Sequence, residues 1–257
     1  MKNIVRQISV VISIMATLVV NTLANTLPIN GQNTGQISDK FKVYFVPAGY
    51  VFAIWGLIYV GLIAYAIFQA LPSQRENPRL QAIGWWVVLG GIANSIWIFL
   101  WHYNQFPLTV IAMLVLLVSL IATYVGLGVN RTKVSAGEKW AVHLPFSIYL
   151  GWITVATVAN ISDVLYYVNW NRFGLSPELW MSIILGAVVV IAALMNFLRR
   201  DVAYTAVLLW ALFGITVRQA GTPVVAPTWV AFGLVGLTLV AGLGLRKPDQ
   251  SKLSEAK

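Results

Sequence analysis

Three aromatic residues spaced along one helix face give this sequence its clearest chemical signal. In the segment 46–59, VPAGYVFAIWGLIY, Phe52, Trp55 and Tyr59 follow the spacing i, i+3, i+7, and Tyr50 precedes them after a Pro-Ala-Gly turn. At 100° per residue the three rings fall within an arc of about 60°, so they share one face of a helix. Aromatic faces suit the binding of flat apolar molecules. The segment is therefore predicted to form one wall of a lipophilic pocket.

Two further apolar segments repeat this stripe, and each carries an asparagine on the striped face. The tryptophans of the three stripes lie about 9 to 15 Å inside their helices, deeper than tryptophans at a membrane interface. An amide facing lipid is costly, so Asn94 and Asn160 are expected to point inward, toward each other, a backbone carbonyl or a ligand. Aromatic residues at helical spacing also serve packing alone, and that alternative stays open. The candidate ligand-binding residues are Tyr50, Phe52, Trp55, Tyr59, Asn94, Trp97, Trp101, Tyr149, Trp152, Ala156 and Asn160.

Residues for catalysis or metal binding are scarce. The chain has no cysteine and only two histidines, His102 and His143, neither with a second ligand at i+3 or i+4, so we expect no metal or axial haem site. Both are expected to be interfacial or capping residues. No paired carboxylates, Ser-His-Asp arrangement or phosphate loop is recognisable, and no catalytic residue is assigned. Asp163 and Arg218, near the ends of two apolar segments, are expected at the membrane interface.

The composition places the stripes in a membrane. Hydrophobic residues make up 59% of the 257 positions and charged residues only 10%, which excludes an ordinary soluble domain. The net charge of +9 comes from basic residues in short loops, so we expect no nucleic-acid partner. The sequence predicts an all-α polytopic membrane protein with eight apolar segments, of which the seventh, residues 202–217, is the shortest. The eight apolar segments that could span a bilayer are residues 8–27, 49–71, 82–103, 107–129, 138–162, 179–198, 202–217 and 227–245.

The distribution of Lys and Arg predicts the orientation in the membrane. With a cytoplasmic N-terminus, thirteen of the seventeen basic residues fall in cytoplasmic segments, as the positive-inside rule requires. Both termini are then cytoplasmic, and the polar segment 28–45 is external. In an alternative, the first apolar segment is a secretory signal cleaved after Thr22-Leu23-Ala24. Cleavage would leave seven spans and the same orientation for the rest.

The motifs resemble the TspO/MBR family, the translocator or tryptophan-rich sensory proteins. The family pattern Pro-x-Gly-Trp-Val-Phe-x-x-x-Trp-x-x-x-Tyr is matched from Pro47 to Tyr59, with Tyr50 in place of the usual Trp. The family's Leu-Asn-x-x-Trp resembles residues 93–97, and its Trp-Val-x-Phe-Ala-Thr-x-Leu-Asn resembles residues 152–160. Three motifs in this order on the expected helices make the resemblance specific.

The resemblance covers residues 8 to 162, and the chain departs from it in three ways. Pro145-Phe146 stands seven residues before the tryptophan of the fifth segment instead of four, so the helix start is expected to be rebuilt. Met113 occupies the position of an acidic residue of the family. The chain also continues beyond the five-helix fold. We therefore expect a TspO-like five-helix domain over 1–162 with an external loop at 28–48, a three-helix membrane extension over 163–246 and a charged cytoplasmic tail at 247–257.

The resemblance also implies a function. It implies a pocket for planar lipophilic ligands such as porphyrin or haem-type tetrapyrroles, with no required cofactor, in the plasma membrane of a bacterium. It further implies dimerisation and a role in tetrapyrrole or stress regulation. Two alternatives stay open. The eight segments favour a transporter of a small lipophilic solute, although no inverted repeat is visible. An enzyme that degrades a tetrapyrrole could use the same pocket.

Overall fold

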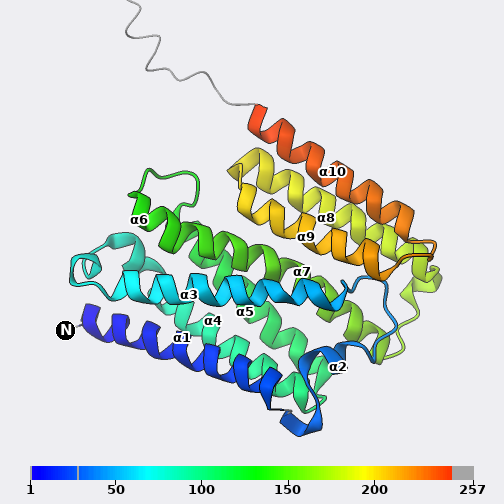
Figure 1. Cartoon of the computed structure of the whole chain (residues 1–257), viewed down its shortest axis with the longest axis horizontal. Helices are drawn as coiled ribbons and strands as arrows, with labels where there is room; N and C mark the ends of the chain where they lie inside the picture. The colour runs from blue at the N-terminus through cyan, green and yellow to red at the C-terminus, as the bar shows by residue number, and fades with distance from the viewer. Residues whose placement is uncertain (1, 28, 245–257) are drawn as a thin grey trace, which may run out of the picture.

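A computed structural model describes residues 2–27 and 29–244, and all regular secondary structure in these residues is helical (Figure 1). Pro28 and the predicted tail 247–257 lie outside the described residues. The long helices are α1 (Lys2–Thr26), α3 (Ile54–Ala70), α4 (Pro78–His102), α5 (Phe106–Leu127), α7 (Leu144–Tyr167), α8 (Pro177–Arg199), α9 (Val202–Arg218) and α10 (Val225–Gly244). The short elements are η1 (Ile29–Gly31), α2 (Thr34–Ser38), η2 (Gly49–Ala53), η3 (Pro72–Gln74), α6 (Ala136–Glu138), the π-turn η4 (Lys139–His143) and η5 (Arg172–Gly174).

The helices have the length and surface of membrane spans. In the described residues seven helical spans are long and apolar enough to cross a membrane, and α9, with 17 residues, is shorter. Large apolar side chains such as Leu57, Val60 and Ile67 of α3 are exposed, as expected where lipid rather than water is the solvent. The prediction of an all-α polytopic membrane protein is confirmed, and each of the eight predicted segments overlaps one long helix.

Five helices form one bundle, and the last three stack on one side of it (Figure 1). Helix α4 packs against α1 and α5, α5 packs against α7, and α3 packs against α1 and α7. On the other side, α8 and α10 pack against each other and against α9, which packs on α7. This contact is close because α7 has Gly151 there, where a Cβ would lie 3.0 Å from the carbonyl oxygen of Tyr204. Helix α9 thus connects the two groups of helices, because it packs against α7 as well as against α8 and α10.

The start of α7 is irregular because a proline follows it. The N-cap Ser135 starts α6, its Oγ accepting a hydrogen bond from the Glu138 N–H at 3.1 Å. In the π-turn that follows, the Leu144 N–H bonds to the Lys139 carbonyl five residues earlier. Pro145 has no N–H to donate, and the extra residue in the wider turn accommodates its ring. The π-turn and Pro145 thus shape the start of α7.

The end of α7 lies farther along the chain than expected. The helix continues to Tyr167, whereas the sequence pattern placed its end at Ser162. The chain leaves the helix only near Asn169, which has a φ of 54°, a left-handed conformation that asparagine tolerates better than most residues. Asp163 therefore lies inside the helix and is only 3% exposed. Its position at the depth of the membrane interface stays a prediction.

Candidate ligand-binding cavity

A cavity lies inside the bundle at the end where segment 29–48 is found, which we call the loop end. Its main chamber has a volume of about 450 Å³ and is lined by residues of α1, α3, α4, α5 and α7 and by the loop. A side chamber of about 60 Å³ shares several lining residues with it, including Trp97 and Trp152. The two chambers together form the cavity.

Nine of the eleven predicted ligand-binding residues line this cavity. The other two lie elsewhere. Tyr149 is buried behind the wall, with its ring centroid 6.0 Å from that of Trp55. Tyr50 is 45% exposed and packs against Trp210 of α9, with ring centroids 5.5 Å apart. The residues that line the cavity are Phe52, Trp55, Tyr59, Asn94, Trp97, Trp152 and Ala156 in the main chamber, with Trp101 and Asn160 in the side chamber.

Contacts between the rings hold the aromatic walls in place. The Trp152 ring makes edge contacts with Phe52 and Trp55 at centroid distances of 5.6 and 6.3 Å. On α4, Trp97 and Trp101 are stacked at 5.2 Å with an interplanar angle of 17°. Such pairs have preferred geometries and add about 0.5–1.5 kcal/mol each beyond their burial. The walls are therefore preorganised before any ligand binds.

The amide of Asn94 points inward as predicted, and it bonds to protein groups. Its Oδ1 accepts a hydrogen bond from Asn21 Nδ2 at 2.6 Å, and its Nδ2 donates to the Tyr149 hydroxyl at 3.1 Å. Asn21 and Asn25 of α1 also line the main chamber, a contribution that the sequence analysis missed. The same argument applied to Asn94, that an amide inside an apolar span must face the interior, would have found Asn21.

The amide of Asn160 orients one of the stripe tryptophans. Its Oδ1 accepts a hydrogen bond from Trp97 Nε1 at 3.3 Å, and its Nδ2 donates to Thr109 Oγ1 at 2.8 Å. Thr109 in turn donates to the Phe106 carbonyl. Asn160 thus links α4, α5 and α7 and fixes the Trp97 ring.

The loop covers the cavity and is anchored on α4 by His102. This side chain is fully buried, with its Nε2 atom 3.0 Å from Thr34 Oγ1, and Asn30 Nδ2 donates to its carbonyl oxygen at 3.0 Å. The neighbouring Trp101 donates its indole N–H to the Thr34 carbonyl at 3.3 Å. Both the imidazole and the indole therefore hold the loop, and the His102 ring contacts the loop instead of capping its own helix.

Helix α9 fixes the turn that leads into α3. The Ala48 N–H donates to the Gly214 carbonyl at 3.0 Å, and Trp210 Nε1 donates to the Val51 carbonyl at 3.1 Å. A Cβ on Gly214 would overlap the side chain of Val51. The chain extension therefore supports the segment that carries Phe52 and Trp55, which no local sequence pattern indicated.

Three charged side chains line the cavity. Arg218 Nη2 donates to Asp39 Oδ1 at 2.9 Å, so Arg218 pairs with the loop rather than with Asp163. Asp163 lines the side chamber, and its buried Oδ1 has no hydrogen-bond partner. The signal that could have found it is spacing, since Asp163 follows Trp152 by eleven residues and so lies on the same helix face.

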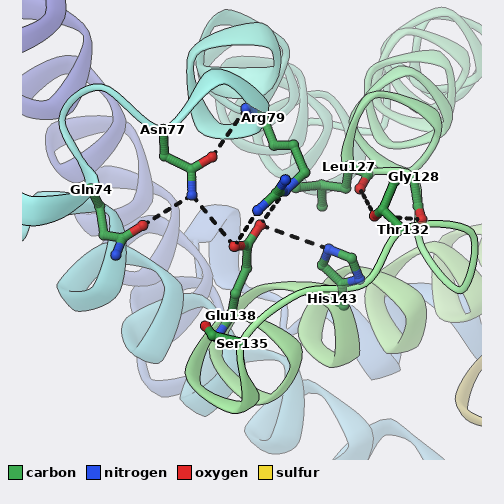
Figure 2. A network of polar contacts seen from close by, with 9 residues as sticks. All are labelled: Gln74, Asn77, Arg79, Leu127, Gly128, Thr132, Ser135, Glu138 and His143. Atoms are coloured by element: carbon green, nitrogen blue, oxygen red, sulfur yellow. Dashed lines mark hydrogen bonds and ion pairs between the residues drawn. The ribbon is translucent and has the colours of Figure 1, made fainter.

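The opposite end of α7 carries a network of hydrogen bonds and ion pairs (Figure 2). Buried Glu138 accepts hydrogen bonds from Arg79 Nε at 2.6 Å and Nη2 at 2.7 Å, and Asn77 Nδ2 adds a longer one at 3.4 Å. The His143 Nε2 atom lies 4.0 Å from the same carboxylate. This two-pronged Arg–Glu pair fixes the start of α4 against the start of α7.

A second buried carboxylate near that end joins the two helix groups. Asp201, the N-cap of α9, is 2% exposed, and its Oδ2 accepts hydrogen bonds from Tyr124 and Ser147, each at 2.7 Å. Its Oδ1 accepts one from the Tyr204 N–H at 3.1 Å. Asp201 therefore ties α9 to α5 and α7.

Apolar helices around an aromatic cavity under a structured loop define a polytopic membrane protein with an interior pocket. The chain matches the TSPO-like protein family over residues 7–243 and belongs to that family. The match includes α8, α9 and nearly all of α10, so the last three helices lie within the range of the family match. No curated protein and no solved structure matches the chain.

Proposed function

We propose that this protein binds planar lipophilic molecules of the porphyrin or haem type in the cavity and thereby regulates tetrapyrrole or stress responses. The cavity itself carries the proposal. Its main chamber of about 450 Å³ falls within the range of roughly 300–1,000 Å³ typical of small-molecule sites. Membership of the TSPO-like family supports this reading.

The chemistry of the walls supports a flat apolar ligand. Tryptophan and phenylalanine rings from α3, η2, α4 and α7 provide stacking surfaces. The amides of Asn94 and Asn160 are already bonded to protein groups, so they do not make the walls hydrophilic. The tetrapyrrole is proposed as a ligand, and folding of the protein does not require it.

We also propose a location and an organisation. The positions of thirteen of the seventeen basic residues favour cytoplasmic termini and an external loop end, in the plasma membrane of a bacterium. Residues 1–162 would form the ligand-binding domain and residues 163–246 an extension joined to it by α9. The family resemblance favours a homodimer.

The test is a titration of purified protein with protoporphyrin IX, followed by porphyrin fluorescence and absorbance. Wild type is expected to bind saturably. The triple variant Trp55→Phe, Trp97→Phe, Trp152→Phe is expected to bind at least tenfold more weakly, because three stacking surfaces become smaller. Ala156→Leu, which fills the cavity and keeps every tryptophan, is expected to weaken binding as well.

The matched control replaces three exposed tryptophans away from the main chamber. Trp85, Trp86 and Trp140 are 57%, 41% and 67% exposed, so their triple phenylalanine variant should bind within twofold of wild type. Equal affinities of wild type, the cavity triple and Ala156→Leu would overturn the proposed site.

A further inference from the structure

We propose that a second pocket at the loop end binds an amphiphile with an anionic head group and an apolar tail, either a membrane phospholipid or a free fatty acid. The second pocket has a volume of about 140 Å³ and lies between the loop, the end of α7, the η5 turn and the start of α8. Among the described residues, none lines both this pocket and the cavity. Binding there is thus independent of the proposed function.

Two of the four basic residues at the loop end are already engaged by protein groups. Lys40 donates a hydrogen bond to Gln32 Oε1, and Arg218 pairs with Asp39. Both partners belong to the loop. These two cations therefore hold the loop in place.

The other two basic residues, Lys42 and Arg172, line the second pocket. Within residues 2–27 and 29–244, neither forms an ion pair. Arg172 Nε donates to the Leu175 carbonyl at 3.2 Å, which fixes the side chain in its turn and leaves the Nη atoms for another acceptor. A guanidinium binds phosphate and carboxylate groups through two parallel hydrogen bonds. Two unpaired cations in one pocket favour an anionic head group.

The acidic residue beside the second pocket does not cancel this charge. Glu178 Oε1 accepts a hydrogen bond from the hydroxyl of Tyr44, a lining residue, at 2.9 Å. Glu178 itself does not line the pocket, and no other acidic residue among the described ones does. Lys42, Arg172 and Glu178 together carry one net positive charge, so an anionic head group is attracted more strongly than a zwitterionic one.

The second pocket leads from a charged surface to a buried apolar end. Lys42 is exposed, whereas Phe45 and Met181 are 2% and 1% exposed, and Leu165 and Ile184 add further apolar surface. The pocket is smaller than a site that encloses a whole drug-sized molecule. We therefore expect it to hold only the head group and the adjoining part of the tail.

The aromatic residues of the second pocket are typical of the depth of lipid head groups. Tyr44, Tyr166, Trp170 and Trp180 all line it, and the rings of Trp170 and Trp180 are in edge contact with centroids 4.9 Å apart. Tyrosine and tryptophan collect at this depth because their rings are apolar and their N–H and O–H groups are polar. Basic pockets between membrane helices are known to bind anionic lipid head groups. Depth and charge thus point to the same class of ligand.

The experiment measures lipid at this pocket alone. The chain has no cysteine, so a single Leu179→Cys substitution can carry a bimane fluorophore. Leu179 is 51% exposed, precedes Trp180 in the chain and does not line the pocket. The labelled full-length protein is placed in phosphatidylcholine nanodiscs, and doxyl-labelled phosphatidylglycerol, phosphatidylcholine or stearate is added. A nitroxide that enters the pocket quenches the bimane.

Half-maximal quenching is expected at a mole fraction at least threefold lower for an anionic amphiphile than for phosphatidylcholine. A preference for phosphatidylglycerol would identify a membrane phospholipid as the source, and a preference for stearate alone would identify a free fatty acid. The double variant Lys42→Gln, Arg172→Gln should bring the ratio of the two mole fractions close to one. Arg172→Lys keeps the charge and should keep most of the preference.

Two controls separate the pocket from overall charge and from misfolding. Arg131→Gln with Lys133→Gln removes the same charge from exposed side chains at the opposite end of the bundle and should keep the wild-type ratio. Lys42→Gln alone removes an exposed side chain that forms no ion pair with a described residue, so it should fold as wild type does and lower the ratio partway. Equal quenching by all three amphiphiles, a preference that survives the pocket double variant, or its loss in the opposite-end control would overturn the inference.

Discussion

The two ends of α7 have opposite surroundings. Near its start, Ser147 and the preceding Glu138 take part in dense hydrogen-bond networks with α4, α5 and α9. Trp152, farther along the helix, and Asp163, near its end, adjoin a cavity, and each has a buried polar atom without a hydrogen-bond partner. One end thus stabilises the fold, while the other borders the cavity in which we propose that a ligand binds. Sites that bind ligands commonly retain such unfavourable features at the expense of stability.

The largest expected effect comes from the same substitution made at both ends. Asp201→Asn should lower the free energy of unfolding by about 2 kcal/mol, because the hydroxyls of Tyr124 and Ser147 lose a charged acceptor. Asp163→Asn should leave it nearly unchanged, because the buried Oδ1 of Asp163 accepts no hydrogen bond that the substitution could remove. Unfolding of the purified variants in one detergent gives both values. Equal losses at the two positions would show that the two ends of α7 do not differ in this way.

An intermediate effect is expected where α9 supports the cavity. Gly214→Ala places a Cβ against Val51 and Pro47, so η2 must shift and carry Phe52 with it. Overpacking of this kind costs about 1–3 kcal/mol, and we expect porphyrin affinity to fall at least threefold. The control is Gly236→Ala in α10, where a Cβ has open space. Unchanged affinity in Gly214→Ala would mean that α9 does not position the cavity wall.

Periodicity in the sequence predicted most of what is local to one helix. The three stripes share an i, i+3, i+7 spacing, and nine of the eleven predicted ligand-binding residues line one cavity. The inward direction of Asn94 and Asn160 followed from the cost of an amide in lipid. These inferences succeed because a helix face and the membrane environment are both properties of short segments.

The remaining features depend on contacts between distant segments. The bond from Trp210 to Val51 joins residues that no local pattern relates, so the position of α9 against η2 could not be predicted. The burial of Asp163 was not predicted, because helix α7 ends at a left-handed turn near Asn169 rather than where the apolar run stops. The pairing of Arg218 with Asp39 was not predicted either. Asp39 lies in a loop, and the path of that loop depends on its anchoring on His102.

The smallest effect is expected at Tyr50, where the sequence departs from the family pattern inside the first motif. The sequence motif places Tyr50 in the predicted pocket, yet its ring packs against Trp210 at the protein surface. Tyr50→Trp should therefore change the affinity for protoporphyrin IX by less than twofold, measured in the same titration as the cavity variants. Ala156→Leu in the cavity supplies the contrast within one experiment. A large change in Tyr50→Trp would place the ligand between α3 and α9 rather than in the cavity, and the contrast between the two ends of α7 would then have no bearing on binding.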